Sequence, residues 1–323
     1  MLTATERATL KRVLVVSNKK GGVGKTSCTS NVGGVLAQAG YRVLGMDLDP
    51  QGHLGVELGY KGTEIDDGGA GLFQSLILGQ ELKPAKNVRP GFDIIPGGPQ
   101  TSHLVDSLLG KAMRGEDPSY LLAKKLAEIA GNYDVILIDC PPGENHLLTQ
   151  AFVAARWVLI PTAPDNGSIN GLVELAQKVI ATRPLNPTIM PLGAVLFAID
   201  SRAVAMKARK AEQIRTVMGD VAPVFTSVIR YSQTAGVDAR DRGQLIIELA
   251  ADAEQQKAQR INWARMLKAR KAGEDVDETI LEEDAKKKGP RISESAAGLA
   301  NDYLSLTGEI IHALAENEKE QVK

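Results

Sequence analysis

The sequence predicts an α/β protein built on a doubly wound, mostly parallel sheet. Apolar runs within 12–16 and 134–139 are typical of strands that are buried on both faces. Such runs alternate along the chain with helical segments, and this order places strands side by side in a parallel sheet. The chain has 323 residues, of which 43% are hydrophobic and 24% charged, as expected for a soluble enzyme with a large core.

The elements follow one another in that alternation. Strands are predicted at 12–16, from 41 to the acidic pair at 47 and 49, and at 134–139, 156–161, 191–199 and 224–229; helices are predicted from 27 onward, at 170–182 and at 203–218. Residues 60–90 are rich in loop formers and contain one short helix near 72–78. In a sheet of this type, ligands bind at the carboxyl ends of the strands.

The turn after the first strand reads KKGGVGKTS, which is the pattern of a phosphate-binding loop. Glycines in such a turn let backbone N–H groups approach phosphates at the positive end of the following helix. Lys25 is expected to reach the β- and γ-phosphates, and the Thr26 hydroxyl to ligate Mg²⁺. The residues predicted to bind the nucleotide are Lys20, Gly21, Gly22, Val23, Gly24, Lys25, Thr26 and Ser27.

Acidic residues end two of the predicted strands. Asp47 and Asp49 are separated by one residue, so on an extended strand both side chains point the same way, and a Pro-Gln-Gly turn follows them. Asp139 ends the strand at 134–139 and is followed by the sequence Pro-Pro-Gly at 141–143. Because hard oxygen ligands suit Mg²⁺, the predicted metal group is Thr26, Asp47 and Asp139. The segment 141–143 is predicted to sense the γ-phosphate.

Lys20, immediately before the glycines, completes a set of three motifs. Together they resemble the deviant Walker ATPases, and within them the ParA-type partition ATPases, over about residues 11 to 250. The resemblance implies a P-loop NTPase fold, ATP and Mg²⁺ as cofactors, and a homodimer in which Lys20 reaches the partner's nucleotide. It also implies that Asp49, Lys20 and Lys25 carry catalysis, with Asp49 positioning the attacking water. His53 departs from the family pattern, which usually has Asn there, and is not expected to bind a metal.

The resemblance further implies how such a protein acts. The ATP-bound dimer would bind nonspecific double-stranded DNA, and a ParB-type centromere-binding protein would stimulate hydrolysis. One alternative is the membrane-associated ATPase of the same superfamily that positions the division site, but that relative ends in a basic amphipathic helix and this chain ends in an acidic segment at 315–320. A second alternative is a metabolic or metal-export ATPase, and the lack of clustered thiols argues against it.

A DNA-binding surface has to be local, because the formal net charge of the chain is only -1. Basic residues gather on or beside the helix predicted at 203–218, and the resemblance implies that Lys and Arg of this half of the fold contact DNA. A solvated helix face explains any one of them equally well. The candidates are Arg202, Lys207, Arg209 and Lys210.

The C-terminal part departs from the family pattern. We expect an ATPase domain at 1–250, a charged helical insertion at 251–292, a closing helix of the ATPase domain at 293–314 and a tail at 315–323. The insertion has a basic stretch at 257–271 followed by an acidic one at 274–284, and five of the six basic side chains fall on one helical face. The insertion is either a DNA or partner surface, or a hairpin whose basic and acidic arms neutralise each other.

The composition predicts a cytoplasmic protein. Cys28 and Cys140 are the only cysteines, and both lie inside nucleotide motifs where a disulfide would be out of place. No apolar run approaches 18 residues, and the first residues lack the apolar core of a signal peptide. We therefore expect no membrane partner, and the resemblance adds association with the nucleoid.

Overall fold

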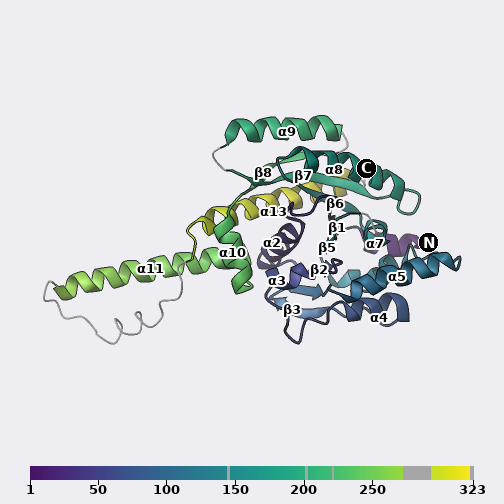
Figure 1. Ribbon diagram of the computed structural model, residues 1–323, viewed down its shortest axis with the longest axis horizontal. Coiled ribbons are helices and arrows are strands. Elements are labelled where there is room, and N and C mark those ends of the chain that lie inside the picture. Colours follow the sequence, from purple (N-terminus) through teal and green to yellow (C-terminus); the bar gives the residue numbers. More distant parts are fainter. Residues whose placement is uncertain (144–145, 201–202, 220–221, 272–291, 321–323) are drawn as a thin grey trace.

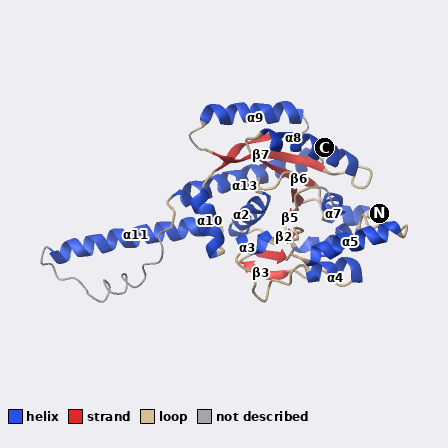
Figure 2. Ribbon diagram, viewed as in Figure 1, coloured by secondary structure: helices blue, strands red, loops and turns tan. Residues whose placement is uncertain are grey.

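The computed structural model describes residues 1–143, 146–200, 203–219, 222–271 and 292–320. Its centre is a sheet of eight strands in the order β3-β4-β2-β5-β1-β6-β7-β8, with helices on both faces (Figures 1 and 2). The pairing is antiparallel between β3 and β4 and parallel between the other neighbours, so the predicted fold class is confirmed. The strands are β1 (Val13–Val16), β2 (Val43–Asp47), β3 (Ala85–Arg89), β4 (Phe92–Ile95), β5 (Val135–Asp139), β6 (Trp157–Thr162), β7 (Met190–Ile199) and β8 (Val224–Arg230).

Helices cover both faces of the sheet. Side chains from α2, α3, α10, α11 and α13 share one apolar core, and those from α4 to α9 share the other. The helices are α1 (Ala4–Thr9), α2 (Lys25–Gln38), α3 (His53–Glu57), α4 (Ala70–Leu78), α5 (Gln100–Met113), α6 (Leu121–Ile129), α7 (His146–Ala154), α8 (Asn166–Thr182), α9 (Val204–Met218), α10 (Gln233–Arg242), α11 (Ile246–Lys271) and α13 (Ser295–Glu320), with a 3-10 turn η1 (Ala130–Asn132).

Each buried strand contributes side chains to both apolar cores. Val13 and Val15 of β1 face the core under α4 to α9, whereas Leu14 and Val16 face the core under α2 and α13. This division follows from the alternation of side chains along a strand. It explains why β1 and β5 are apolar at almost every position, with polar groups appearing only where the strands end.

The chain reverses its direction of winding at β1, which pairs with β5 on one side and with β6 on the other. In doubly wound sheets this switch point leaves a crevice at the carboxyl ends of the strands. The phosphate loop leaves the sheet from the end of β1, and Asp47 and Asp139 end the neighbouring strands β2 and β5 in register with each other. The topology therefore gathers the sequence motifs at one edge.

Several helices were not predicted from the sequence, α5, α6, α7 and α10 among them, and α1, α11 and α13 also differ from the expectation. The short helix α1 precedes the first strand, and a hydrogen-bonded capping box between Thr3 and Glu6 begins it. Helix α13 continues to Glu320, past the boundary expected at 314. Helix α11 runs without a break through residue 250, where the insertion was expected to begin, and leaves the body of the molecule (Figure 1).

Residues 272–291 of the expected insertion lie outside the described part of the chain. The domain boundaries therefore stay predictions. Among the residues that the structure describes, no helix is both long and apolar enough to cross a membrane.

Candidate functional site

The phosphate loop joins β1 to α2 through left-handed glycines. Gly22 has φ 73° and Gly24 has φ 86°, a region that residues with a Cβ rarely adopt. Gly24 also has no room for a side chain, because a Cβ there would collide with the ring of Phe197. Gly24 is the N-cap of α2 and makes no side-chain cap, so the first N–H groups of that helix are available to an anion.

Lys25 is held inside the loop. Its side chain is buried and its Nζ donates a hydrogen bond to the backbone oxygen of Lys20 at 3.0 Å. Burial lowers the pKa of Lys25, and the carboxylate of Asp139 opposes that shift. An ammonium group that has lost its water gains more from a phosphate partner than an exposed one does. The position therefore fits the predicted contact with a phosphate.

Thr26 and Asp139 form the pair expected of a magnesium site. Thr26 Oγ1 donates to Asp139 Oδ2 at 2.7 Å, which ties the start of α2 to the end of β5. Asp139 is fully buried, and its Oδ1 has no hydrogen-bond partner among the described residues. The pKa of Asp139 is raised well above its usual range, first by burial and second by the nearby charge of Asp47. An orphaned buried carboxylate oxygen beside a hydroxyl is a donor set that suits Mg²⁺.

Asp47 and Asp49 have different surroundings, although both follow the same strand. Asp47 is fully buried, its Oδ1 accepts from the N–H of Asp49 at 2.8 Å, and its Oδ2 accepts from the N–H of Leu54 at 3.2 Å. Burial raises the pKa of Asp47 to about 7, although these backbone hydrogen bonds oppose the shift. Because both of its oxygens accept backbone hydrogen bonds, the geometry supports a role for Asp47 in fixing the turn, and its predicted part in the metal group stays a prediction.

Asp49 lines the cleft beside the phosphate loop. Its Oδ1 accepts the N–H of Gln51 at 3.0 Å, which fixes the carboxylate at the start of the Pro-Gln-Gly turn. Asp49 is the one residue of the acidic pair that reaches this cleft, so the structure separates the two acids that the sequence placed side by side. Its predicted role in positioning water stays a prediction, and this placement supports it.

The Lys20 side chain lies at the rim of the site and is half-exposed, unlike the buried Lys25. Its Nζ is 2.7 Å from Asp165 Oδ1, and each side chain is 43% exposed. Asp165 is also the N-cap of α8, where it accepts hydrogen bonds from the N–H and the hydroxyl of Ser168. Burial alone would raise the pKa of Asp165, but the hydrogen bonds from Lys20 and Ser168 outweigh it and lower the pKa to about 2. Lys20 and Lys25 therefore have separate partners.

The phosphate loop opens onto a cleft of about 710 Å³. Its walls come from the loop, from the turn after β2, and from Pro141 and Pro142 after β5. Gly143 N donates to Lys19 O at 3.2 Å, so the predicted γ-phosphate sensor touches the phosphate loop directly. His53 lines the cleft as well, at the start of α3.

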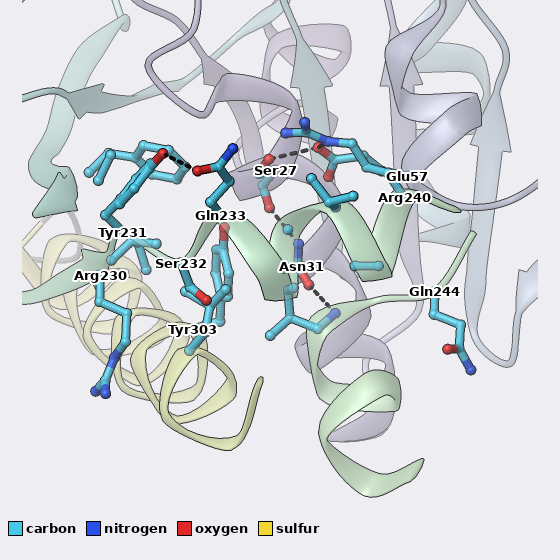
Figure 3. A pocket seen from close by; sticks show the side chains of 18 of the residues that line it. Ser27, Asn31, Glu57, Arg230, Tyr231, Ser232, Gln233, Arg240, Gln244 and Tyr303 are labelled. Carbon is cyan, nitrogen blue, oxygen red and sulfur yellow. Dashed lines mark hydrogen bonds and ion pairs between the residues drawn. The ribbon is translucent and has the colours of Figure 1, made fainter. Parts of the chain in front are cut away.

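A second cavity, of about 380 Å³, adjoins the first (Figure 3). The two cavities share Gly22, Ser27, Glu57, Phe197 and Arg240 in their walls, so they form one continuous cleft. The far part of the second cavity is lined by amide and aromatic side chains of α2, α10 and α13 and of the neighbouring loops. These are Asn31, Tyr231, Gln233, Gln244 and Tyr303.

Glu57 connects the two halves of the cleft. Ser27 Oγ donates to Glu57 Oε1 at 2.7 Å, and Arg240 Nε lies 3.7 Å from Glu57 Oε1 (Figure 3). Ser30 Oγ donates to Glu57 Oε2 at 2.5 Å. Sequence reasoning missed Glu57, Arg240, Phe197 and Asp165. Each lies far along the chain from the residue it contacts, outside any motif, so no local pattern could have found them.

The residues proposed for DNA contact are not equally available. Arg209 is exposed and Lys207 is half-buried on α9, whereas Lys210 is only 7% exposed. Lys210 therefore cannot present its ammonium group to DNA in this conformation, and we leave it out of any DNA surface. Arg202 lies outside the described residues.

Comparison with known proteins gives matches over most of this architecture. A family model described as an AAA domain matches residues 11–190. The chromosome partitioning protein ParA of Caulobacter vibrioides is 36% identical over 224 residues, which cover 68% of this chain and 80% of that protein. Residues 11–190 of this chain include the phosphate loop and both acidic motifs.

Two solved structures are similar in fold. Apo McdA from Cyanothece superposes with a TM-score of 0.63 at 23% identity, over 72% of this chain and 91% of that one. Cobyrinic acid a,c-diamide synthase from Mycobacterium smegmatis, with a bound ATP analogue and magnesium, superposes with a TM-score of 0.59 at 28% identity. The match covers 72% of this chain and 92% of that one. This fold therefore binds a nucleotide together with magnesium.

Lys25 gives the most direct test of the site. Hydrogen bonds to charged groups contribute about 1.5–3 kcal/mol each, so losing the contacts of Lys25 with two phosphates should weaken ATP binding on the order of 100-fold or more. We expect this of Lys25→Ala in a fluorescent-nucleotide titration. Lys19→Ala is the matched control, because Lys19 lies in the same loop but pairs with Glu174. An affinity of Lys25→Ala within about twofold of wild type would place the phosphates elsewhere.

Proposed function

The chain belongs to the ParA-type ATPase family, and on that basis we propose that it partitions DNA through an ATP-dependent dimer. It hydrolyses ATP, as members of the family do. In the proposed cycle, two copies bind ATP and associate face to face, the dimer binds double-stranded DNA without reading its sequence, and a ParB-type centromere-binding protein stimulates hydrolysis and release. The protein would act in the cytoplasm on the nucleoid.

The position of Lys20 is the observation that carries this proposal. Lys25 already supplies a buried cation to the loop, so a second lysine at the rim is not needed for the same phosphates. Lys20 is held by Asp165 in a half-exposed ion pair, and such surface pairs contribute only about 0–1 kcal/mol. A phosphate of a partner's nucleotide, with its greater charge, can therefore compete for Lys20. This supports a contact in trans.

The residues of the cleft divide the work of hydrolysis. The N–H groups at the start of α2 and the Lys25 ammonium would bind phosphate oxygens, while Thr26 and Asp139 would hold Mg²⁺. Bound Mg²⁺ supplies positive charge where negative charge builds up on the phosphates. The Asp49 carboxylate would accept a hydrogen bond from the attacking water and orient it.

The second cavity is the part of the cleft that suits the base and sugar of the nucleotide. It adjoins the phosphate loop through Ser27 and ends among amide side chains, which can donate and accept hydrogen bonds (Figure 3). The ring of Phe197 lies at the junction, above Gly24. A nucleotide that spans both cavities would order α2 and α10 together.

DNA binding is the first test of the proposed function. Wild-type protein should co-sediment with double-stranded DNA of any sequence in ATP and Mg²⁺ but not in ADP, and retention should fall steeply as salt rises. Lys25→Ala should not be retained in either nucleotide. Retention on anionic liposomes in place of DNA would favour the membrane-associated alternative, and retention on neither would favour a metabolic ATPase.

Lys20 and Asp165 test the dimer. Lys20→Ala should bind ADP normally yet stay monomeric in ATP by light scattering, because its proposed contact lies in the partner. Asp165→Asn keeps a good N-cap for α8 but removes the charge that holds Lys20, so it should strengthen dimerisation in ATP. If Lys20→Ala dimerises like wild type, Lys20 is only a surface residue.

Asp49 tests the chemical step. Asp49→Ala should keep ATP and Mg²⁺ through Lys25, Thr26 and Asp139 but lose hydrolysis by about 10²- to 10⁴-fold, the usual cost of removing a group that positions water. The variant should accumulate as an ATP dimer on DNA, in contrast to the monomer expected of Lys20→Ala. Turnover is measured with DNA and the partner protein present. Near-normal turnover in Asp49→Ala would transfer the role to another carboxylate.

A further inference from the structure

The long helix α11 has a fixed root and a projecting end. At the root, the N–H of Ile246 donates to Asn31 Oδ1 on α2 at 2.8 Å, and Arg89 pairs with Glu248 at 2.6 Å. Ile246 and Leu249 are buried in the core under α2 and α13. Beyond this root the helix runs away from the sheet (Figure 1). The direction of the projecting end is thus set by the ATPase body.

The projecting end, residues 255–271, is here called the arm. It contains six basic residues and no acidic residue, in a chain whose formal net charge is -1. Four of the basic side chains are described and all four are exposed: Lys257, Arg260, Arg265 and Lys268. None of these four makes an ion pair with any described residue. Some exposed cations elsewhere do have partners on their own helices, such as Arg215 with Glu212 and Lys319 with Glu316.

The four exposed cations share one side of the arm. At roughly 100° per residue they fall within an arc of about 140°, so they form a continuous basic stripe. Trp263 and Met266, which are half-buried, lie outside that arc. At about 1.5 Å per residue the arm is roughly 25 Å long, which is enough to follow a row of several phosphates on duplex DNA.

The composition of the arm favours a helix. No residue of the arm whose side chain is described is buried. It consists largely of Ala, Gln, Lys, Arg, Met and Leu, which are strong helix formers. Its cations lie toward the C-terminus of α11, whereas Glu248, Asp252 and Glu254 lie nearer the start, an arrangement that suits the helix dipole. The exposed basic side of this helix is available as a contact surface.

We propose that the arm is a DNA-binding surface in which Lys257, Arg260, Arg265 and Lys268 contact the phosphates of duplex DNA. This inference rests on the proposed function, which makes DNA the partner, and it assigns the contact to a segment outside the family pattern. A stripe of cations that neutralises phosphates binds DNA without depending on its sequence. A helix of this diameter also fits against a groove of B-DNA.

An anionic membrane is the other partner that a basic helix can have, and the arm suits it less well. Helices that lie on membranes need a continuous apolar face opposite the charges. Here the exposed apolar residue Ile261, which is 46% exposed, falls inside the basic stripe, whereas Trp263 and Met266 on the other side are half-buried. The basic side chains of the arm are therefore exposed, whereas the apolar side chains opposite them are half-buried and do not form the exposed apolar face that a membrane needs.

The root of α11 gives the arm a connection to the nucleotide. Gln244 and Ile246 line the second cavity, and Asn31, which accepts the N–H of Ile246, lies on the helix that begins at the phosphate loop (Figure 3). Nucleotide in this cleft would thus contact both α2 and the root of the arm. The ATP form and the ADP form can therefore hold the arm differently.

The test is the double variant Lys257→Gln with Lys268→Gln in the full chain. Glutamine keeps the helix propensity and removes the charge. With ATP and Mg²⁺ and random-sequence duplex DNA, the variant should bind on the order of tenfold or more weakly near 0.1 M salt. The slope of log K against log salt should become shallower by about 2 for each subunit whose arm contacts DNA, and by about twice that for a dimer that uses both arms, since each lost phosphate contact contributes about 0.9. Basal ATPase activity and dimerisation should stay at wild-type values.

Two control variants keep the result interpretable. Lys257→Arg with Lys268→Arg keeps the charge and should bind DNA like wild type with an unchanged slope. Lys83→Gln with Lys124→Gln removes two exposed lysines far along the chain from the arm and should also leave the slope unchanged. Circular dichroism should show the same helix content in all variants.

Three outcomes would overturn the proposal. If wild type binds DNA and the arm variant binds it with the same affinity and slope, the arm is not the surface, and the proposed function stands. If the variant instead loses retention on phosphatidylserine vesicles while its DNA binding is unchanged, the arm is a membrane contact. If wild type itself does not bind DNA in ATP, the proposed function fails, and the arm proposal fails with it.

Discussion

The site depends on a carboxylate that the fold buries at the end of β5. Asp139 is fully buried, its Oδ2 accepts from Thr26, and its Oδ1 has no partner among the described residues. Leaving a buried charged acceptor unsatisfied costs more than the roughly 1–3 kcal/mol typical of a neutral group. The parallel sheet forces this position, because the strand tip is covered by helices on both faces. The structure therefore has a local need for a cation at the point where α2 begins.

The phosphate loop places its own groups beside the buried carboxylate of Asp139. Its left-handed glycines bring the start of α2 against the end of β5. The ring of Phe197 packs directly on Gly24, so no side chain can be accommodated at that position. Lys25 is buried beside Asp139 and has a lowered pKa, whose first cause is burial. Cation, hydroxyl and carboxylate are thus fixed before any ligand arrives, and preorganised groups of this kind reorganise little when charge develops.

A network of hydrogen bonds and one ion pair connects the phosphate loop to helices α10 and α11. Glu57 accepts from Ser27 and Ser30 on α2 and faces Arg240 on α10. One turn farther along α2, Asn31 holds the first residue of α11. The same helix therefore begins at the phosphate loop and contacts the root of the arm through Asn31. In a close-packed protein, a small shift at one end of such a rigid helix is transmitted to its other contacts.

The sequence by itself determined the fold class, the phosphate loop and the order of the acidic motifs. These are local properties: apolar runs fix the buried strands, and glycines fix the turn, whatever packs against them later. Only the tertiary structure decided that Asp49 reaches the cleft while Asp47 fixes a turn, and that Lys210 is buried although its helix looks basic throughout. It also decided that Lys20 pairs with Asp165, and that α13 continues to Glu320. The reason is that such pairings join segments far apart along the chain, as between Thr26 and Asp139, and depend on how helices pack across the sheet, which no local period of the sequence records.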